Sequence, residues 1–251
     1  MADQPILLTM VANYATTMVA NYATTMVANY ATTIAILGGT GKEGKGLAYR
    51  WAKAGYRVLI GSRTPERARA AAQELLDRLG EGVYIEGLSN LEAAQKADIA
   101  ALTVPYAAHR ETLESVKSAL QGKILIDVTV PLVPPKVTKV QMPPAGSAAQ
   151  EAREILGQGV EVASAFQNIS HEHLLHDESV ECDVLVCGTS KEARAEALKL
   201  VAAAGLTGWD AGPLENSMVV EGLTSVLIGI NKQYGGTQAG IRITGARKKI
   251  D

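Results

Sequence analysis

The chain of 251 residues is long enough for one large α/β domain or for a nucleotide-binding domain with a smaller neighbour. Hydrophobic residues make up 47% and charged residues 20% of the sequence, which is typical of a globular protein and excludes a chain that is disordered throughout. The 24 Lys and Arg and 26 Asp and Glu leave a net charge of -2 without a basic patch. This balance gives no reason to expect nucleic acid or a membrane as a partner.

The sequence favours a cytoplasmic location. No apolar run approaches the roughly 18 residues of a membrane helix, and no Lys or Arg precedes Lys42 to provide the positive start of a secretory signal. Cys182 and Cys187 lie five residues apart in one apolar run, so on a strand they would point to opposite faces. We interpret them as buried free thiols in a reducing compartment, and not as a metal or redox pair.

The octapeptide Met-Val-Ala-Asn-Tyr-Ala-Thr-Thr occurs three times in succession over residues 10–33. Its period is much shorter than the roughly 20 residues of the shortest solenoid repeats, so the copies are not expected to stack as structural units. We interpret residues 1–32 as an N-terminal extension without a chemical role. An added edge strand is the alternative, because Val, Tyr and Thr favour β structure.

From residue 33 onward, segments typical of strands and of helices alternate. Strands are expected at residues 33–37, 57–60, 83–85, 99–104 and 124–130, and helices at 42–54, 65–79, 91–97 and 110–120. Apolar strands separated by helices are typical of a parallel sheet covered on both faces. Because crossovers in such sheets are right-handed, the segment 33–132 is predicted to form a Rossmann-type doubly wound domain.

A proline-rich stretch from Pro131 to Pro144 is the expected domain boundary. Beyond it, helices are expected from residue 147 and at 191–204 and 216–234, and strands at 160–166, 184–186 and 240–245. The predicted fold class is α/β, with the doubly wound parallel sheet followed by a smaller C-terminal α/β part at residues 133–251. The apolar helix at 217–230 is longer than a small domain needs, which favours a homodimer interface there.

A glycine motif, Gly39-x-Gly41-x-x-Gly44, lies between the first expected strand and helix. Such glycines allow a tight turn, a close approach to a pyrophosphate, and a close contact between helix and strand. The free N–H groups at the start of the helix then hold phosphate. The motif alone also fits a glycine-rich turn, but its place between strand and helix favours dinucleotide binding. The residues expected to bind are Gly39, Thr40, Gly41, Lys42, Glu43 and Gly44.

The end of the second expected strand indicates which dinucleotide is bound. An NAD enzyme has Asp or Glu there to accept from the ribose hydroxyls, whereas this chain has Ser62 and Arg63, with Arg67 one helical turn later. A hydroxyl and guanidinium groups bind a 2′-phosphate through charge-assisted hydrogen bonds, which favours NADP. The alternative is a solvated arginine at a helix start, paired with Glu66.

Together these segments resemble the opening of the deazaflavin-dependent NADP reductases, which move hydride between NADP and the 8-hydroxy-5-deazaflavin coenzyme F420. The resemblance runs from Thr33 to Gly245 and continues through Leu-Thr-Val-Pro at 102–105, Ser-Ala-Phe at 164–166, Asp-Val-Leu-Val-Cys-Gly at 183–188 and Asp-Ala-Gly-Pro-Leu at 210–214. It implies an NADP-dependent oxidoreductase with F420 as its second cofactor.

The resemblance also implies where each cofactor lies. Thr40 and Gly41 would contact the pyrophosphate, Ser62, Arg63 and Arg67 the 2′-phosphate, Val104, Pro105 and Tyr106 the nicotinamide, and Ser147, Ala165, Gln167 and Asn168 the deazaflavin. Some members have histidine at the position of Gln167, so a titrating group there is not essential to this chain. Gln167 or Asn168 would hydrogen-bond the ring edge, and the protein would mainly align two rings within about 3–3.5 Å.

Two other functions are considered. An NADP-dependent imine, ketone or metal-chelate reductase would need a proton donor, for which the sequence offers Tyr106, His109 or His171. A non-catalytic NADP-binding regulatory protein would need no second pocket. His171, His173 and His176 lack the His-Glu-x-x-His spacing of zinc peptidases, so we expect no metal site and interpret them as polar helix residues near the cleft. His109 is interpreted as structural.

Overall fold

The computed structural model describes residues 32–246 of the chain. The N-terminal extension predicted for residues 1–32, with its octapeptides and the alternative edge strand, lies outside the described residues apart from Thr32.

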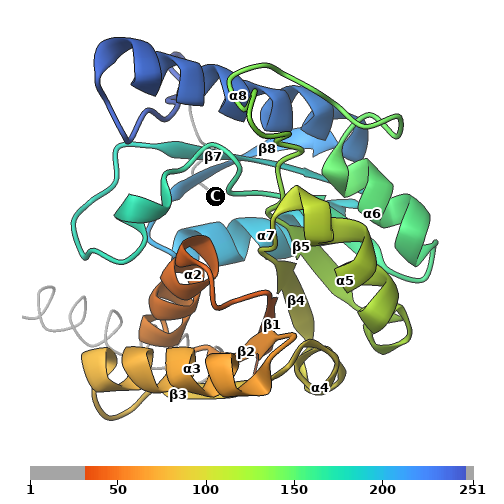
Figure 1. Ribbon diagram of the computed structural model, residues 1–251, viewed down its shortest axis with the longest axis vertical. Coiled ribbons are helices and arrows are strands. Elements are labelled where there is room, and N and C mark those ends of the chain that lie inside the picture. Colours follow the sequence, from red (N-terminus) through yellow and green to blue (C-terminus); the bar gives the residue numbers. More distant parts are fainter. Residues whose placement is uncertain (1–31, 247–251) are drawn as a thin grey trace, which may run out of the picture.

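Eight strands form one mostly parallel sheet in the order β3-β2-β1-β4-β5-β6-β7-β8 (Figure 1). The strands are β1 (Thr33–Leu37), β2 (Arg57–Ser62), β3 (Tyr84–Ser89), β4 (Ile99–Leu102), β5 (Ile124–Asp127), β6 (Glu161–Ser164), β7 (Asp183–Gly188) and β8 (Thr207–Pro213). The first six are parallel, β7 runs antiparallel to β6, and β8 is parallel to β7. The predicted Rossmann-type α/β fold is therefore confirmed.

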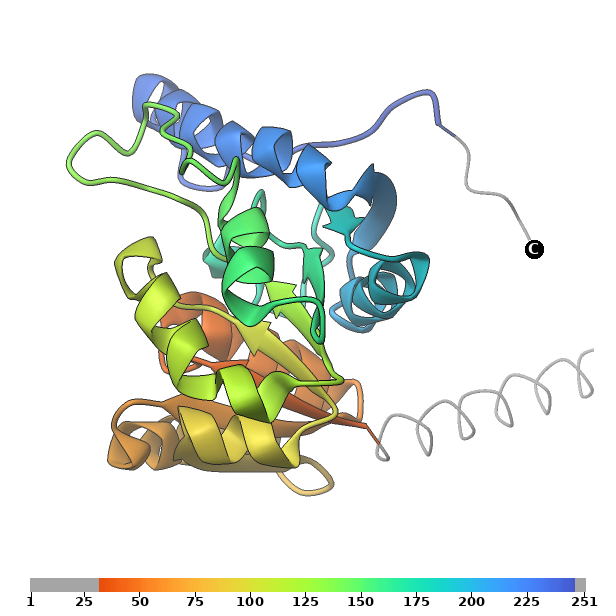
Figure 2. The ribbon, with the colours of Figure 1, turned by 90° about the vertical axis from the view of Figure 1, so that its right-hand side faces the viewer.

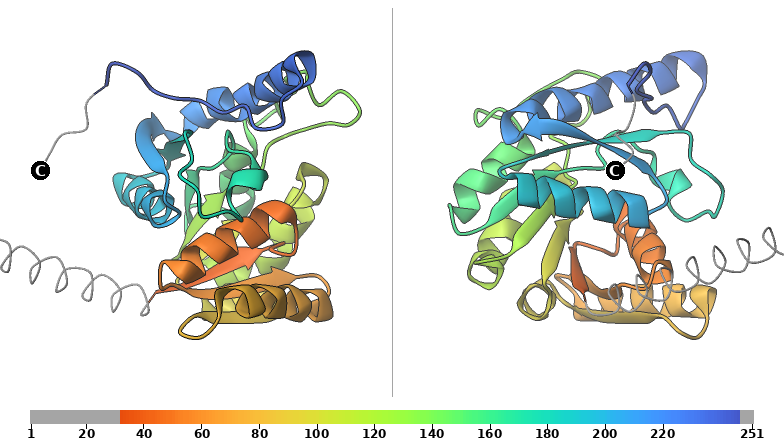
Figure 3. Two further views of the ribbon diagram at one scale, coloured as in Figure 1. Left: turned by 90° about the vertical axis from the view of Figure 1, so that its left-hand side faces the viewer. Right: turned by 180° about the vertical axis from the view of Figure 1, so that it is seen from behind.

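Helices cover both faces of this sheet. They are α2 (Lys42–Lys53), α3 (Pro65–Leu79), α4 (Asn90–Lys96), α5 (His109–Val116), α6 (Ala148–Leu156), α7 (Lys191–Ala203) and α8 (Ser217–Tyr234), with the 3-10 helices η1 (Tyr106–Ala108), η2 (Lys117–Leu120), η3 (His171–His173) and η4 (Leu214–Asn216). One apolar cluster joins α2, α3 and α7 to the sheet, and a second joins α4, α5 and α6. Figure 2 shows α4, α5 and α6 on the near face, and the opposite view in Figure 3 shows α2 and α3.

Several strand positions differ from the predictions. β4 and β5 end at Leu102 and Asp127, earlier than expected, and their carboxyl ends open into loops. No strand forms over the predicted residues 240–245. Ile241 O accepts from Asp183 N at 2.7 Å, but Ile243 N donates to the Asp183 carboxylate at 2.8 Å, so the side chain interrupts the ladder. β8 was not predicted, because its two glycines and a proline obscure the apolar pattern.

The sheet continues across the predicted boundary between residues 132 and 133, because β5 pairs with β6. The division into residues 33–132 and 133–251 stays a prediction. Cys182 and Cys187 are buried free thiols, as expected. Among the described helices, none has the length and apolar character that crossing a membrane would need.

Candidate functional site

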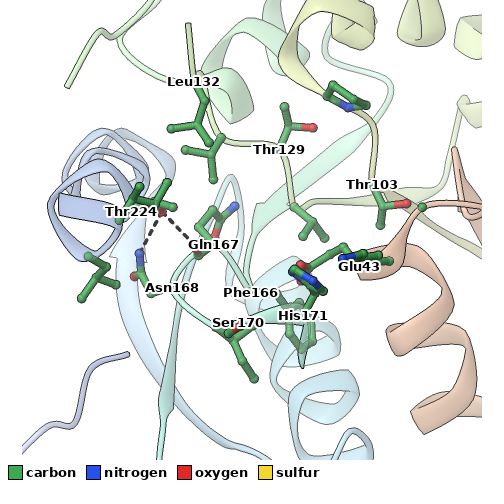
Figure 4. Close-up of a pocket in the computed structure, with 18 of the residues that line it drawn as sticks. Glu43, Thr103, Thr129, Leu132, Phe166, Gln167, Asn168, Ser170, His171 and Thr224 are labelled. Atoms are coloured by element: carbon green, nitrogen blue, oxygen red, sulfur yellow. Dashed lines mark hydrogen bonds between the residues drawn. The ribbon is translucent and has the colours of Figure 1, made fainter. Parts of the chain in front are cut away.

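A cavity of about 560 Å³ lies at the carboxyl ends of β1, β4, β5 and β6, and α8 forms its far wall (Figure 4). Its walls come from the start of α2, the loops after β4 and β5, the loop after β6, and residues 224–239. The strand order reverses between β1 and β4, which is the position where open α/β sheets bind ligands.

The glycine turn brings α2 very close to the sheet. A Cβ on Gly44 would lie 2.6 Å from Gly39 Cα and 2.7 Å from Thr103 Oγ1, so only glycine allows this approach. A Cβ on Gly41 would have Gly38 O, at 4.0 Å, as its nearest neighbour and would point into open space. Gly41 is the N-cap of α2, and no side chain caps it. The first N–H groups of the helix are therefore free to bind an anion, and the open Gly41 position fits a pyrophosphate.

Asn90 supports this turn, which the sequence did not indicate. Its Oδ1 accepts from the Gly38 N–H at 3.1 Å, and a Cβ on Gly61 would lie 2.7 Å from the same oxygen. Asn90 is the first residue of α4, on the crossover that follows β3. A polar residue at a helix start resembles an ordinary cap, so the sequence offered no signal for its role.

The residues predicted to bind the 2′-phosphate lie at the end of β2, directly after it and in the first turn of α3. Ser62 is buried, and its Oγ accepts from Thr64 N at 3.1 Å. Arg63 and Arg67 are exposed, and within residues 32–246 neither takes part in an ion pair. Glu66, considered as a partner for these arginines, pairs instead with Arg69 at 2.6 Å. Both guanidinium groups are therefore available to a ligand.

Strained backbone positions the loop after β6. Phe166 has a φ of 75°, a left-handed conformation that is uncommon for a bulky residue and often marks ligand sites. Its ring is buried and meets Trp51 edge to face, with centroids 5.9 Å apart. This contact holds Gln167 and Asn168 at the cavity wall.

Hydrogen bonds to backbone carbonyl oxygens determine which way the side-chain amides of Gln167 and Asn168 point. Gln167 Nε2 donates to Asp127 O at 2.7 Å, and Asn168 Nδ2 donates to Val220 O at 2.9 Å. Because a carbonyl oxygen can only accept, the NH₂ groups must face these partners. Gln167 Oε1 and Asn168 Oδ1 are then buried acceptors without a partner among the described residues. Leaving such acceptors unpaired costs about 1–3 kcal/mol each, so they fit a ligand that carries N–H donors.

Thr224 of α8 links the two amides, and the sequence did not identify it. Its hydroxyl donates to Gln167 O at 2.8 Å and accepts from Asn168 Nδ2 at 3.2 Å (Figure 4). Thr224 also lines the cavity, so α8 both forms the far wall and holds the loop after β6.

Two titratable side chains line the cavity near the start of α2. Glu43 Oε1 and His171 Nε2 are both buried and have no hydrogen-bond partner among the described residues (Figure 4). Burial raises the pKa of Glu43 to about 8, so its carboxyl group is largely neutral near pH 7. The sequence predicted Glu43 through its backbone position and gave no indication that its side chain would be buried.

The predicted site residues fall into two groups. Those that line the cavity are Gly41, Lys42, Glu43, Val104, Pro105, Gln167 and Asn168. Those that do not line it are Gly39, Thr40, Gly44, Ser62, Arg63, Arg67, Tyr106, Ser147 and Ala165. The Tyr106 hydroxyl donates to Glu151 at 2.7 Å, and the buried Ser147 caps α6 by accepting from Gln150 N at 2.9 Å. Ala165 is fully buried.

The histidine cluster contributes one side chain to the cavity, His171. The backbone carbonyls of His173 and His176 accept hydrogen bonds from Arg50 of α2. These bonds hold the loop that contains the histidines against α2. Over the described part of the chain, no three His, Cys, Asp or Glu side chains are grouped to hold a metal ion.

Comparison with known proteins places the chain in a family. The family model described as "NADP oxidoreductase coenzyme F420-dependent" matches residues 33–131. The F420-dependent NADP reductase of Methanocaldococcus jannaschii is 41% identical over 84% of this chain and 97% of its own length. The reductase of the same name from Methanothermobacter marburgensis is 43% identical, with the same coverage.

A solved structure supports the fold. The crystal structure of a candidate F420-dependent NADP reductase from Arthrobacter sp. FB24 superposes with a TM-score of 0.71 at 23% identity, covering 86% of this chain and 100% of that one. The similarity to the archaeal reductases extends over nearly their whole length. The chain belongs to the family of F420-dependent NADP reductases.

Proposed function

We propose that this protein transfers a hydride between NADP(H) and coenzyme F420, the activity named for its archaeal relatives. It is an NADP-dependent oxidoreductase that uses both cofactors. The observation that carries the proposal is one cavity of about 560 Å³, which joins the open turn at Gly41 to the unpaired amide oxygens of Gln167 and Asn168. Its volume is within the usual range for small-molecule sites.

On the nucleotide side, the start of α2 would hold the pyrophosphate. Gly39, Thr40, Gly41, Lys42, Glu43 and Gly44 form this turn. The unpaired Arg63 and Arg67 guanidinium groups, with Ser62, would receive the 2′-phosphate, because charge-assisted hydrogen bonds favour that anion. Val104 and Pro105, at the carboxyl end of β4, would form the wall for the nicotinamide.

On the opposite side, Gln167 Oε1 and Asn168 Oδ1 would accept from the N–H groups of the deazaflavin edge. When bound, the two rings supply the hydride donor and acceptor. The chain aligns the rings and excludes water, and neither task requires a titrating group. The side chains of Tyr106 and Ser147 bond to Glu151 and to the Gln150 N–H of α6, and Ala165 is fully buried, so these three residues would not contact the rings directly.

The alternative functions are less well supported by this arrangement. An imine or ketone reductase needs a proton donor at the substrate. The Tyr106 hydroxyl is bound to Glu151 and His109 is fully buried, so His171 on the cavity wall is the candidate donor that a ketone-reduction assay has to test. A regulatory protein that only binds NADP would have no use for the two amide oxygens across the cavity. The discriminating experiment is NADPH oxidation with F420, a simple ketone or chelated iron as the acceptor. We expect rapid turnover with F420 alone.

The role proposed for Gln167 can be tested by substitution. Gln167→Leu removes the acceptor and is expected to weaken F420 binding by about 0.5–1.5 kcal/mol, which is several-fold, with less effect on NADPH. Gln167→His retains a polar group and should keep the reaction running. Fluorescence titration of each cofactor measures both affinities, with Gln73→Leu on the exposed face of α3 as a control. Equal losses for NADPH and F420 would contradict the assignment.

The raised pKa of Glu43 predicts how NADPH binding depends on pH. Its carboxyl group is neutral below about pH 8 and becomes an anion above it, beside the proposed pyrophosphate site. We therefore expect the NADPH affinity to fall by about tenfold between pH 7 and 9, since one pKa unit corresponds to about 1.36 kcal/mol. Glu43→Gln stays neutral and should hold its affinity across this range. Parallel losses in the wild type and the variant would show that Glu43 is not the titrating group.

We also propose that α8 forms a homodimer interface. Met218, Val219, Val226, Ile230 and Tyr234 of this helix are large apolar side chains exposed by 42–77%. Val219, Val226 and Ile230 recur at helical spacing and so share one face.

The cytoplasmic location expected from the sequence stays a prediction.

A further inference from the structure

A buried, hydrogen-bonded pair of titratable side chains, His109 and Asp127, lies next to residues of the cavity wall. His109 is the first residue of α5 and Asp127 the last of β5, and both are fully buried. His109 Nε2 lies 2.8 Å from Asp127 Oδ2. A carboxylate in the middle of a sheet is costly to bury unless a partner compensates it, and the imidazole is that partner.

Asp127 also holds two residues of the cavity wall. Its Oδ1 accepts from Thr129 N at 2.9 Å, and its backbone oxygen accepts from Gln167 Nε2 at 2.7 Å. Thr129 and Gln167 both line the cavity. Asp127 therefore connects the loop after β5 to the loop after β6.

His109 connects the same carboxylate to the wall formed by the loop after β4. It follows directly on Val104, Pro105 and η1, and its imidazole ring lies 5.8 Å from the Tyr106 ring. The His109–Asp127 contact therefore ties the proposed nicotinamide wall to the proposed deazaflavin wall.

The charges around His109 and Asp127 favour a hydrogen bond between them that does not depend on pH. Burial lowers the pKa of His109, but the Asp127 carboxylate and, more weakly, Glu151 raise it above its ordinary value in spite of Arg110. Asp127 also helps to raise the pKa of Glu221 on α8, after the larger effect of burial, and Tyr106 is bound to Glu151. Since Nε2 faces a carboxylate oxygen, it carries a proton in both the neutral and the charged imidazole. The hydrogen bond therefore persists across the pH range in which His109 titrates.

We propose that His109 and Asp127 form a positioning pair, which fixes Thr129 and Gln167 relative to the Val104–Pro105 wall and so sets the spacing of the two rings. Neither side chain lines the cavity, so both act through the residues they hold. The effect on ring spacing rests on the proposed function, whereas the effect on the cavity wall does not.

Amide hydrogen exchange of the protein without cofactors tests the structural part. His109→Leu removes the donor, whereas His109→Gln places an amide N–H near the position of Nε2. We expect the Thr129 amide to exchange at least tenfold faster in His109→Leu, and within about threefold of wild type in His109→Gln. The amide of Ile36 in β1 is the control for global opening. An unchanged Thr129 rate, or an equal acceleration at Ile36, would overturn the proposal.

A second comparison removes the buried charge, in case His109→Leu alone does not fold. Asp127→Asn leaves a neutral side chain that His109 can still hydrogen-bond. In the double variant His109→Leu with Asp127→Asn, this hydrogen bond is absent. We expect faster exchange at Thr129 in the double variant than in Asp127→Asn. Equal rates would show that His109 contributes only charge compensation.

Single-turnover kinetics at saturating cofactor concentrations test the effect on the reaction. We expect His109→Leu to slow hydride transfer by about tenfold or more while the NADPH Kd changes by less than about threefold, and His109→Gln to restore the rate. If wild type does not reduce F420, the proposed function fails and the exchange result still decides the positioning role. If wild type reduces F420 and His109→Leu changes neither exchange nor rate, the inference alone fails.

Discussion

Replacing Ser62 with Asp and Arg63 with Ala is expected to shift the cofactor preference from NADPH towards NADH by about 2–4 kcal/mol. An aspartate at the buried end of β2 would repel the 2′-phosphate and accept from the ribose hydroxyls of NADH. Arg63 is exposed and has no ion pair within the described residues, so its loss should not weaken the fold. The ratio of kcat/KM for NADPH and NADH measures the shift.

The control for this double variant is Arg69→Ala on the following helix, α3. Arg69 is a surface cation paired with Glu66 at 2.6 Å, and it is not assigned to the cofactor. Its replacement should leave the preference unchanged. A folded Ser62→Asp/Arg63→Ala variant that keeps its full NADPH preference would show that the 2′-phosphate binds elsewhere.

Two alanine substitutions in the glycine turn are expected to affect different properties: Gly44→Ala lowers folding stability, and Gly41→Ala weakens NADPH binding. In Gly44→Ala, the new Cβ would lie 2.6 Å from Gly39 Cα and force the helix away from the sheet. Such overpacking costs about 1–3 kcal/mol of folding stability. In Gly41→Ala, the nearest atom is 4.0 Å away and φ is -76°, which alanine tolerates, so stability should be unchanged.

The Gly41 methyl group would instead occupy the proposed approach of the pyrophosphate. We expect Gly41→Ala to weaken NADPH binding by tenfold or more, equivalent to about 1.4 kcal/mol. Thermal unfolding and NADPH titration of both variants separate the two effects. Normal NADPH affinity in a folded Gly41→Ala protein would contradict the placement of the pyrophosphate at this turn.

Local sequence patterns were sufficient to predict most of the sheet and pointed to the glycine turn at the start of α2. The alternation of apolar strands and helices indicated seven of the eight strands, since β8 was missed. The antiparallel turn from β6 to β7 could not be predicted, because it depends on how the long loop over residues 165–182 folds back. The glycine motif could be recognised because its residues are neighbours in the sequence, whereas the role of Ser62 stays a prediction.

The rest of the site depends on contacts between distant segments. Asn90 contacts Gly38 across 52 residues, and Thr224 contacts Gln167 across 57. Neither residue belongs to a motif, so only the folded chain brings them together. His109 was interpreted as structural for the same reason, since Asp127 gave no sign of being its partner.

Stereospecific deuterium transfer tests the central claim most directly. NADPH labelled with deuterium at one or the other C4 position is mixed with protein and F420 in ordinary water, and the reduced deazaflavin is analysed by mass spectrometry. Because the proposed arrangement aligns the two rings in one cavity and needs no exchangeable donor, we predict nearly complete transfer from one labelled NADPH and none from the other. Deuterium released to solvent, or NADPH oxidised without reduction of F420, would contradict direct hydride transfer at this site.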